Sequence, residues 1–114
     1  MQTKVRLKND VIIIEPVSRL IGTSIVELRD TIYTEIGHWK TPRILFDFHR
    51  TRRIDSGGLG VLLSALATVK QREGSIGVMN LSKIQNLLMK SHILRCFEHY
   101  DEENAAVSCM VHAA

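Results

Sequence analysis

The residues best suited to chemistry in this sequence are an acid, a serine and two glycines that stand together as Asp55-Ser56-Gly57-Gly58. Apolar residues follow at the three- and four-residue spacing of one helix face: Leu59, Leu62, Leu63, Leu66 and Val69. Asp55 and Ser56 therefore fall at a helix start, where backbone N–H groups lack partners. A serine hydroxyl in this positive potential, beside a carboxylate, suits the addition or removal of a phosphate. Alternatively, Ser56 is a plain helix cap and Asp55 a cap or turn acid.

Known catalytic and nucleotide-binding motifs do not fit this stretch. A dinucleotide-binding fingerprint needs a small residue where Leu63 stands, and a P-loop needs a Gly-Lys-Ser/Thr sequence that is missing. A nucleophile elbow needs glycine in place of Ile54. No histidine shows the spacing of a catalytic triad or of metal ligands: His38, His49, His92, His99 and His112. The sequence thus predicts no catalytic residue, no cofactor and no metal.

The elements that must position the Asp-Ser-Gly-Gly stretch alternate between strand and helix patterns. Apolar periodicity and turn residues predict strands at residues 5–7, 11–14, 43–48, 75–81 and 93–97. Helices are expected at residues 24–37 and 57–72, after Ser82, and after Asp101. The β-branched run at residues 11–14 predicts a central strand that is buried on both faces. This alternation predicts an α/β fold with a largely parallel sheet.

The sequence also predicts two helix caps and several side chains that face the core. Capping boxes, in which a serine and an acid or amide three residues later cap a helix, are expected twice: Ser24 with Glu27, and Ser82 with Gln85. Side chains near the third helix and the fifth strand are expected to face the core: Ile84, Leu87, Leu88 and Cys96.

Length and composition narrow the class of protein. We expect residues 1–114 to form one domain, because this length is enough for a core of its own. A formal charge of +3 is low for a nucleic-acid binder, and no apolar run reaches the ~20 residues of a membrane helix. Two cysteines make no disulfide scaffold and fit a reducing compartment. We therefore expect a cytoplasmic protein, monomeric or weakly dimeric, that binds neither nucleic acid nor membranes.

Residues 54–62 (Ile-Asp-Ser-Gly-Gly-Leu-Gly-Val-Leu) resemble the signature of STAS domains, in particular that of the bacterial anti-sigma factor antagonists. That signature is roughly Asp-Ser-Ser/Thr-Gly-Leu-Gly and joins the third strand to the second helix. The resemblance extends to residues 44–47, 78–82 and 93–97, and so covers nearly the whole chain. It implies a single STAS-like domain with an N-terminal hairpin, a four- to five-stranded, mostly parallel mixed sheet, and about four helices.

The resemblance also implies a function without catalysis, that of a partner switch. In the family, the unphosphorylated antagonist binds an anti-sigma factor serine kinase and so frees a sigma factor. Phosphorylation of the motif serine by that kinase breaks the complex, and a serine phosphatase resets it. Matched motif to motif, the phosphorylated residue is Ser56 and the acid before it is Asp55. The sequence departs from the family at Gly57, where a second hydroxyl residue is usual, and at residues 16–22, which lack a Gly-x-Leu-Asp motif.

The partner is expected to contact the motif and the basic loop before it: Arg50, Arg52, Arg53, Asp55, Ser56, Gly57, Gly58 and Leu59. The three arginines could attract an acidic partner surface, or they could simply be solvated. A second possible function is a STAS-like domain that binds a nucleotide, a lipid or another small ligand at the same helix start. Such a domain could also serve as a scaffold in another signalling or transport complex.

Overall fold

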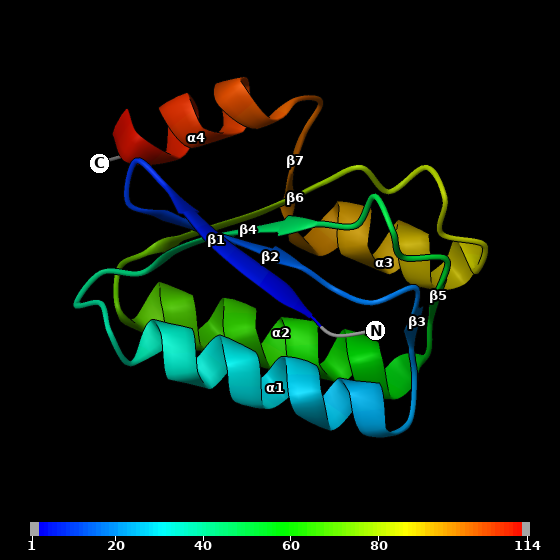
Figure 1. The fold of residues 1–114 in the computed structure, drawn as a ribbon. Helices are drawn as coiled ribbons and strands as arrows, with labels where there is room; N and C mark the ends of the chain where they lie inside the picture. The colour runs from blue at the N-terminus through cyan, green and yellow to red at the C-terminus, as the bar shows by residue number, and fades with distance from the viewer. Residues whose placement is uncertain (1–2, 113–114) are drawn as a thin grey trace.

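In the computed structural model, which describes residues 3–112, strands and helices alternate along the chain (Figure 1). The strands are β1 (Lys4–Lys8), β2 (Val11–Glu15), β3 (Arg19–Leu20), β4 (Arg43–Asp47), β5 (Arg53–Ile54), β6 (Ser75–Met79) and β7 (Glu98–Tyr100). The helices are α1 (Thr23–Ile36), α2 (Ser56–Gln71), α3 (Leu87–Cys96) and α4 (Glu103–His112). No helix in this range is both long and apolar enough to cross a membrane.

Five strands form the main sheet, in the order β1-β2-β4-β6-β7. Strand β1 pairs antiparallel with β2 as a hairpin, and the other neighbours are parallel. Helices α1, α2 and α3 cover one face of the sheet, and α4 covers the other (Figure 1). The mixed, mostly parallel sheet, the N-terminal hairpin and the four helices predicted from the sequence are confirmed.

Strand β2 supplies the centre of the core. Ile12 and Ile14 pack in the larger apolar cluster, which includes residues of α1, α2 and α3. Val11 and Ile13 point the other way, into a smaller cluster with α4. Because side chains alternate along a strand, this unbroken β-branched run is buried on both faces, as predicted.

The third helix and the fifth strand differ from the prediction. Residues 93–97 were expected as a strand but mostly lie in α3. The last strand of the main sheet is instead β7, which follows α3. The Asn86 side chain caps α3 by accepting a hydrogen bond from the Met89 N–H at 3.3 Å, so no Ser82–Gln85 capping box forms. This helical phase buries Ile93 and leaves Leu87, Leu88 and Cys96 exposed, although they were expected to face the core.

The first helix also begins differently from the prediction. Gly22 occupies its N-cap position and makes no side-chain cap, so the Ser24–Glu27 capping box is wrong. The Ser24 hydroxyl instead accepts from the Ile21 N–H at 3.0 Å. The Glu27 carboxylate accepts from the Thr3 N–H at 2.8 Å and so ties the start of the chain to α1.

Candidate functional site

The Asp-Ser-Gly-Gly stretch lies at one end of the main sheet, beside a second, two-stranded ladder. Strands β3 and β5 pair in parallel there, with Leu20 opposite Ile54. The carbonyl oxygen of Ser18 accepts from the Arg52 N–H at 2.8 Å and from the Arg53 N–H at 3.2 Å. This pairing brings residues 16–22 against the motif. Each strand of this ladder has only two residues, which is too short to leave a periodic signal in the sequence.

Asp55, and not Ser56, caps helix α2. The Asp55 Oδ1 atom accepts a hydrogen bond from the Gly58 N–H at 2.9 Å. Ser56 is the first residue of the helix and its side chain is exposed. Among residues 3–112, the Ser56 hydroxyl has no hydrogen-bond partner. The structure therefore excludes the plain-cap interpretation of Ser56 and leaves its hydroxyl accessible at a helix N-terminus.

Two glycines let α2 start close to its neighbours. A Cβ atom on Gly58 would lie 3.0 Å from the Ile54 side chain and 3.1 Å from the Leu20 carbonyl oxygen. A Cβ atom on Gly57 would lie 3.1 Å from the Ile25 side chain of α1. Position 57, where the family usually carries a hydroxyl residue, is therefore a tight contact between α2 and α1 that a glycine fits.

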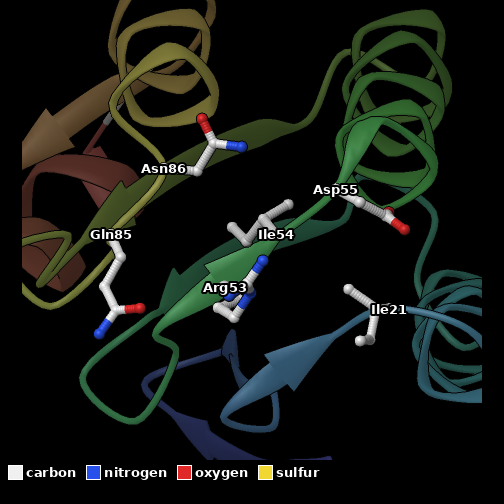
Figure 2. A pocket seen from close by; sticks show the side chains of 6 residues that line it. All are labelled: Ile21, Arg53, Ile54, Asp55, Gln85 and Asn86. Atoms are coloured by element: carbon white, nitrogen blue, oxygen red, sulfur yellow. The ribbon is translucent and has the colours of Figure 1, made fainter.

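A cavity of about 330 Å³ opens beside the motif. Figure 2 shows Asp55 at the start of α2 on one side, Gln85 and Asn86 leading into α3 on the other, and Arg53 and Ile54 between them. The Gln85 N–H donates to the Arg52 carbonyl oxygen at 2.8 Å. This bond joins the loop before α3 (residues 80–86, the α3 loop) to the loop before α2 (residues 48–55, the motif loop). Both α2 and α3 begin at this cavity, and their N-termini carry partial positive charge.

The three arginines before the motif have different surroundings. The Arg50 guanidinium donates to the Glu15 carbonyl oxygen at 3.0 Å, and its side chain is mostly buried. Arg52 and Arg53 are exposed at the motif end of the domain. Arg50 thus braces the loop, whereas Arg52 and Arg53 can meet a partner.

The predicted contact residues are therefore only partly on the surface. The exposed ones are Arg52, Arg53, Asp55, Ser56 and Gly57. The remaining ones are partly or fully covered: Arg50, Gly58 and Leu59. A partner that covers the start of α2 would meet the first group directly, and the second group shapes the backbone beneath it.

The loop between β4 and β5 is fixed by buried polar groups. The fully buried Thr51 hydroxyl donates to the Val17 carbonyl oxygen at 3.0 Å. The Asp47 Oδ1 atom accepts from the His49 N–H at 3.0 Å and from the Asn80 side-chain amide at 2.9 Å. These bonds hold the loop that leads into the motif.

Glu15, Asp47 and His49 bring potential metal-ligand atoms within 4.8 Å of one another, a grouping that sequence spacing did not reveal. The Arg6 guanidinium lies beside the two carboxylates, 3.2 Å from Glu15 and 4.0 Å from Asp47. The imidazole of His49 lies 3.0 Å from Asp47. Since a cation already compensates these acids, we assign the cluster to anchoring of the loop.

A group of charged side chains links β1 to α4, away from the motif. The Arg6 guanidinium donates to both carboxylate oxygens of Glu103, and the Lys8 ammonium lies 3.2 Å from the same carboxylate. The hydrogen bond from Arg6, supported by Lys8 and opposed by burial, lowers the pKa of Glu103 to about 2. The same hydrogen bond raises the pKa of Arg6. This interaction fastens α4 to the sheet.

The family model described as the STAS domain matches residues 2–106 of the chain. The fold is also similar to that of an anti-sigma-factor antagonist (STAS) domain protein from Planctomyces limnophilus. That pair has a TM-score of 0.80 and 18% identity, over 96% of this chain and 98% of the other. A comparison with curated protein sequences gave no significant match.

Two structures of the anti-sigma factor antagonist SpoIIAA are similar as well. The unphosphorylated form has a TM-score of 0.75 and 19% identity, over 98% of this chain and 99% of that one. The phosphorylated form, described as a Bacillus cell fate determinant, has a TM-score of 0.67 and 21% identity, over 90% and 95% of the two chains. At these identities the likeness establishes a shared fold.

Proposed function

The chain belongs to the STAS domain family, and we propose on that basis that it is an anti-sigma factor antagonist that acts by partner switching. In this proposal the unphosphorylated protein, a monomer or weak dimer in the bacterial cytoplasm, binds an anti-sigma factor serine kinase. Phosphorylation of Ser56 releases the kinase, and a serine phosphatase restores binding. The protein regulates transcription in this way and catalyses no reaction of its own. The observation that carries the proposal is the exposed, uncommitted hydroxyl of Ser56 at the start of α2.

Charge explains how a phosphate on Ser56 could act as a switch. The group adds roughly −1.5 to −2 charges at neutral pH. The N-terminus of α2 tolerates that charge, because its N–H groups and its dipole favour anions. A partner packed over Ser56 would instead bury the phosphate next to the Asp55 carboxylate, at a large desolvation cost. The domain therefore keeps its fold and loses its partner.

Asp55 has a second role in this proposal. Its Oδ1 atom is engaged in the cap with Gly58, and its side chain is exposed beside Ser56. The carboxylate can orient the serine hydroxyl or a metal ion carried by the kinase with its nucleotide. An asparagine would keep the cap but lose the negative charge, so the two roles of Asp55 can be separated.

The proposal is tested with the purified protein, the purified anti-sigma factor kinases of the source organism, and ATP. We expect one phosphate on Ser56, mapped by mass spectrometry, and loss of the complex once it is added. Ser56→Ala should bind and stay unmodified, whereas Ser64→Ala, at another exposed serine of α2, should behave as wild type. A kinase complex that survives Ser56 phosphorylation would contradict the proposal.

The cavity beside the motif supports the second possible function, a small-ligand site. Its volume of about 330 Å³ and its lining of Arg53, Asp55, Gln85 and Asn86 suit a small polar group. A nucleotide or lipid retained through purification and identified by mass spectrometry, with no phosphate on Ser56 after kinase treatment, would favour this function over partner switching.

A further inference from the structure

The two most exposed large apolar side chains of residues 3–112 are neighbours at the start of α3. Leu87 is 75% exposed and Leu88 is 60% exposed. They follow the capping residue Asn86 and so lie on the first turn of the helix. The α3 loop is hydrogen-bonded to the motif loop through Gln85 and Arg52, and the two loops face each other across the cavity (Figure 2).

These leucines contribute little to the folded domain. The core side of α3 is made by Ile93, which is fully buried, and by the partly buried Met89. Full burial of a leucine side chain stabilises a protein by about 1.5–3 kcal/mol, and these two exposed leucines gain little of that. Polar residues at the same positions would leave the folded domain about as stable. Adjacent exposed leucines next to a candidate site therefore indicate a surface that is covered by another molecule.

The charge around the leucines is almost entirely positive. Residues 18–22, 52–56 and 82–88, which meet at this end of the domain, carry four exposed basic side chains: Arg19, Arg52, Arg53 and Lys83. Their one carboxylate belongs to Asp55, which caps α2. The N-termini of α2 and α3 add partial positive charge. A partner that complements this end of the domain must present carboxylates.

We propose that Leu87 and Leu88 anchor the same partner protein that reads Ser56, by entering an apolar groove on that protein which is bordered by Asp and Glu side chains. This inference rests on the proposed function and extends its contact surface from the start of α2 to the first turn of α3. The leucines supply the apolar contact, and Arg52, Arg53 and Lys83 supply charge attraction that weakens with salt. A phosphate on Ser56 would stand between this basic surface and the partner's carboxylates, and would repel them.

The first experiment measures the affinity of the full-length protein for the purified anti-sigma factor kinase that modifies Ser56. The double variant Leu87→Ser/Leu88→Ser should bind about tenfold or more weakly, as expected for the loss of an interface anchor. Leu7→Ser is the matched control, because Leu7 is 59% exposed on the outer strand β1, away from the motif. It should change affinity by less than about twofold. Unaltered thermal unfolding of each variant would verify its fold.

The positive rim is tested by a charge reversal. Lys83→Glu should weaken binding about tenfold at low salt, and the effect should shrink as salt is raised. Lys40→Glu, at an exposed lysine that follows α1, should leave the affinity unchanged. If the leucine variant binds like wild type while Ser56 is still phosphorylated and still releases the kinase, the inference is wrong and the proposed function stands.

A second experiment covers the case in which no kinase binds. A photo-crosslinking amino acid is placed at position 87, or at position 7 as a control, in the full-length protein inside the source cells. A cross-link at position 87 alone, to an identified protein and weakened by Lys83→Glu, would support the leucine surface while the proposed function fails. No cross-link at position 87, or equal ones at both positions, would overturn the inference.

Discussion

The carboxylate of Asp55 lies 2.9 Å from the backbone nitrogen of Gly58, and this single contact decides the role of Ser56, which follows Asp55 in the sequence. Asp55 satisfies an N–H group at the start of α2, so Ser56 takes the first helical position with an exposed hydroxyl. The serine is thus available for modification without loss of the cap.

Substitutions of Asp55 should separate capping from chemistry. Asp55→Ala removes the cap and should lower the free energy of unfolding by about 1 kcal/mol, whereas Asp55→Asn should keep it within a few tenths. Both variants should be phosphorylated more slowly than wild type, because both lack the carboxylate. Urea denaturation and a kinase time course provide the two measurements. Wild-type phosphorylation of Asp55→Asn would show that the acid acts only as a cap.

Ser56→Glu should imitate the phosphorylated state. A negative charge in the first turn of α2 should leave the stability unchanged or raise it by about 0.3–1 kcal/mol, because it complements the helix dipole. Kinase binding should nevertheless be lost. Denaturation curves and calorimetric titration, with Ser64→Glu as the matched change farther along α2, distinguish an electrostatic effect at the site from unfolding. Binding of Ser56→Glu at wild-type affinity would be the contrary result.

Alanine substitutions at Gly58 and Gly60 should have opposite effects. A Cβ atom on Gly60 would meet nothing within 4 Å, so Gly60→Ala should stabilise the protein by about 0.4–1 kcal/mol. The same change at Gly58 pushes against Ile54 and the Leu20 carbonyl and should destabilise by about 1–3 kcal/mol. Thermal unfolding of the two variants side by side provides the test. If both variants were stabilised equally, the β3–β5 ladder would have to shift at little energetic cost to make room for a Cβ atom at position 58.

The interaction of Glu103 with Arg6 should make stability depend on pH in the acid range. Since the folded-state pKa of Glu103 is lowered to about 2 from an ordinary value of 4.5, its contribution is complete above about pH 4.5 and is lost as the pH falls toward 2. Glu103→Gln should therefore be less stable than wild type at pH 7, by up to about 1 kcal/mol for this partly exposed pair. The two proteins should converge near pH 2. Urea denaturation at several pH values measures this difference, and a pH-independent difference would point to packing instead.

Much of the fold could be predicted because its signals are local. The β-branched run at residues 11–14 indicated a strand buried on both faces, and the leucine spacing after Gly58 indicated α2. The strand predicted at residues 93–97 was wrong, because a short apolar run fits a strand or a helix equally well. Asn86, a good capping residue three positions before Met89, was the signal that could have identified α3.

The candidate site was predicted only where it is continuous in sequence. Ser56 and Asp55 were identified from their own motif, although their capping roles were left open. Three contacts with distant segments were missed: the Leu20–Ile54 pairing, the Gln85–Arg52 hydrogen bond and the grouping of Glu15, Asp47 and His49. Such contacts depend on tertiary packing, and no spacing rule on one strand or helix reveals them. The separation of Arg50 from Arg52 and Arg53 has the same origin.

The pairing of β3 with β5 has a consequence for engineering this domain. Arg19 and Leu20 are bound along their backbone to Arg53 and Ile54, so neither segment can be reshaped without its companion. A chimera that borrows only the serine motif of a relative would combine it with a mismatched support. Exchange of partner choice between relatives should therefore succeed when residues 16–22 and 52–60 are transplanted together, and fail when either is moved alone.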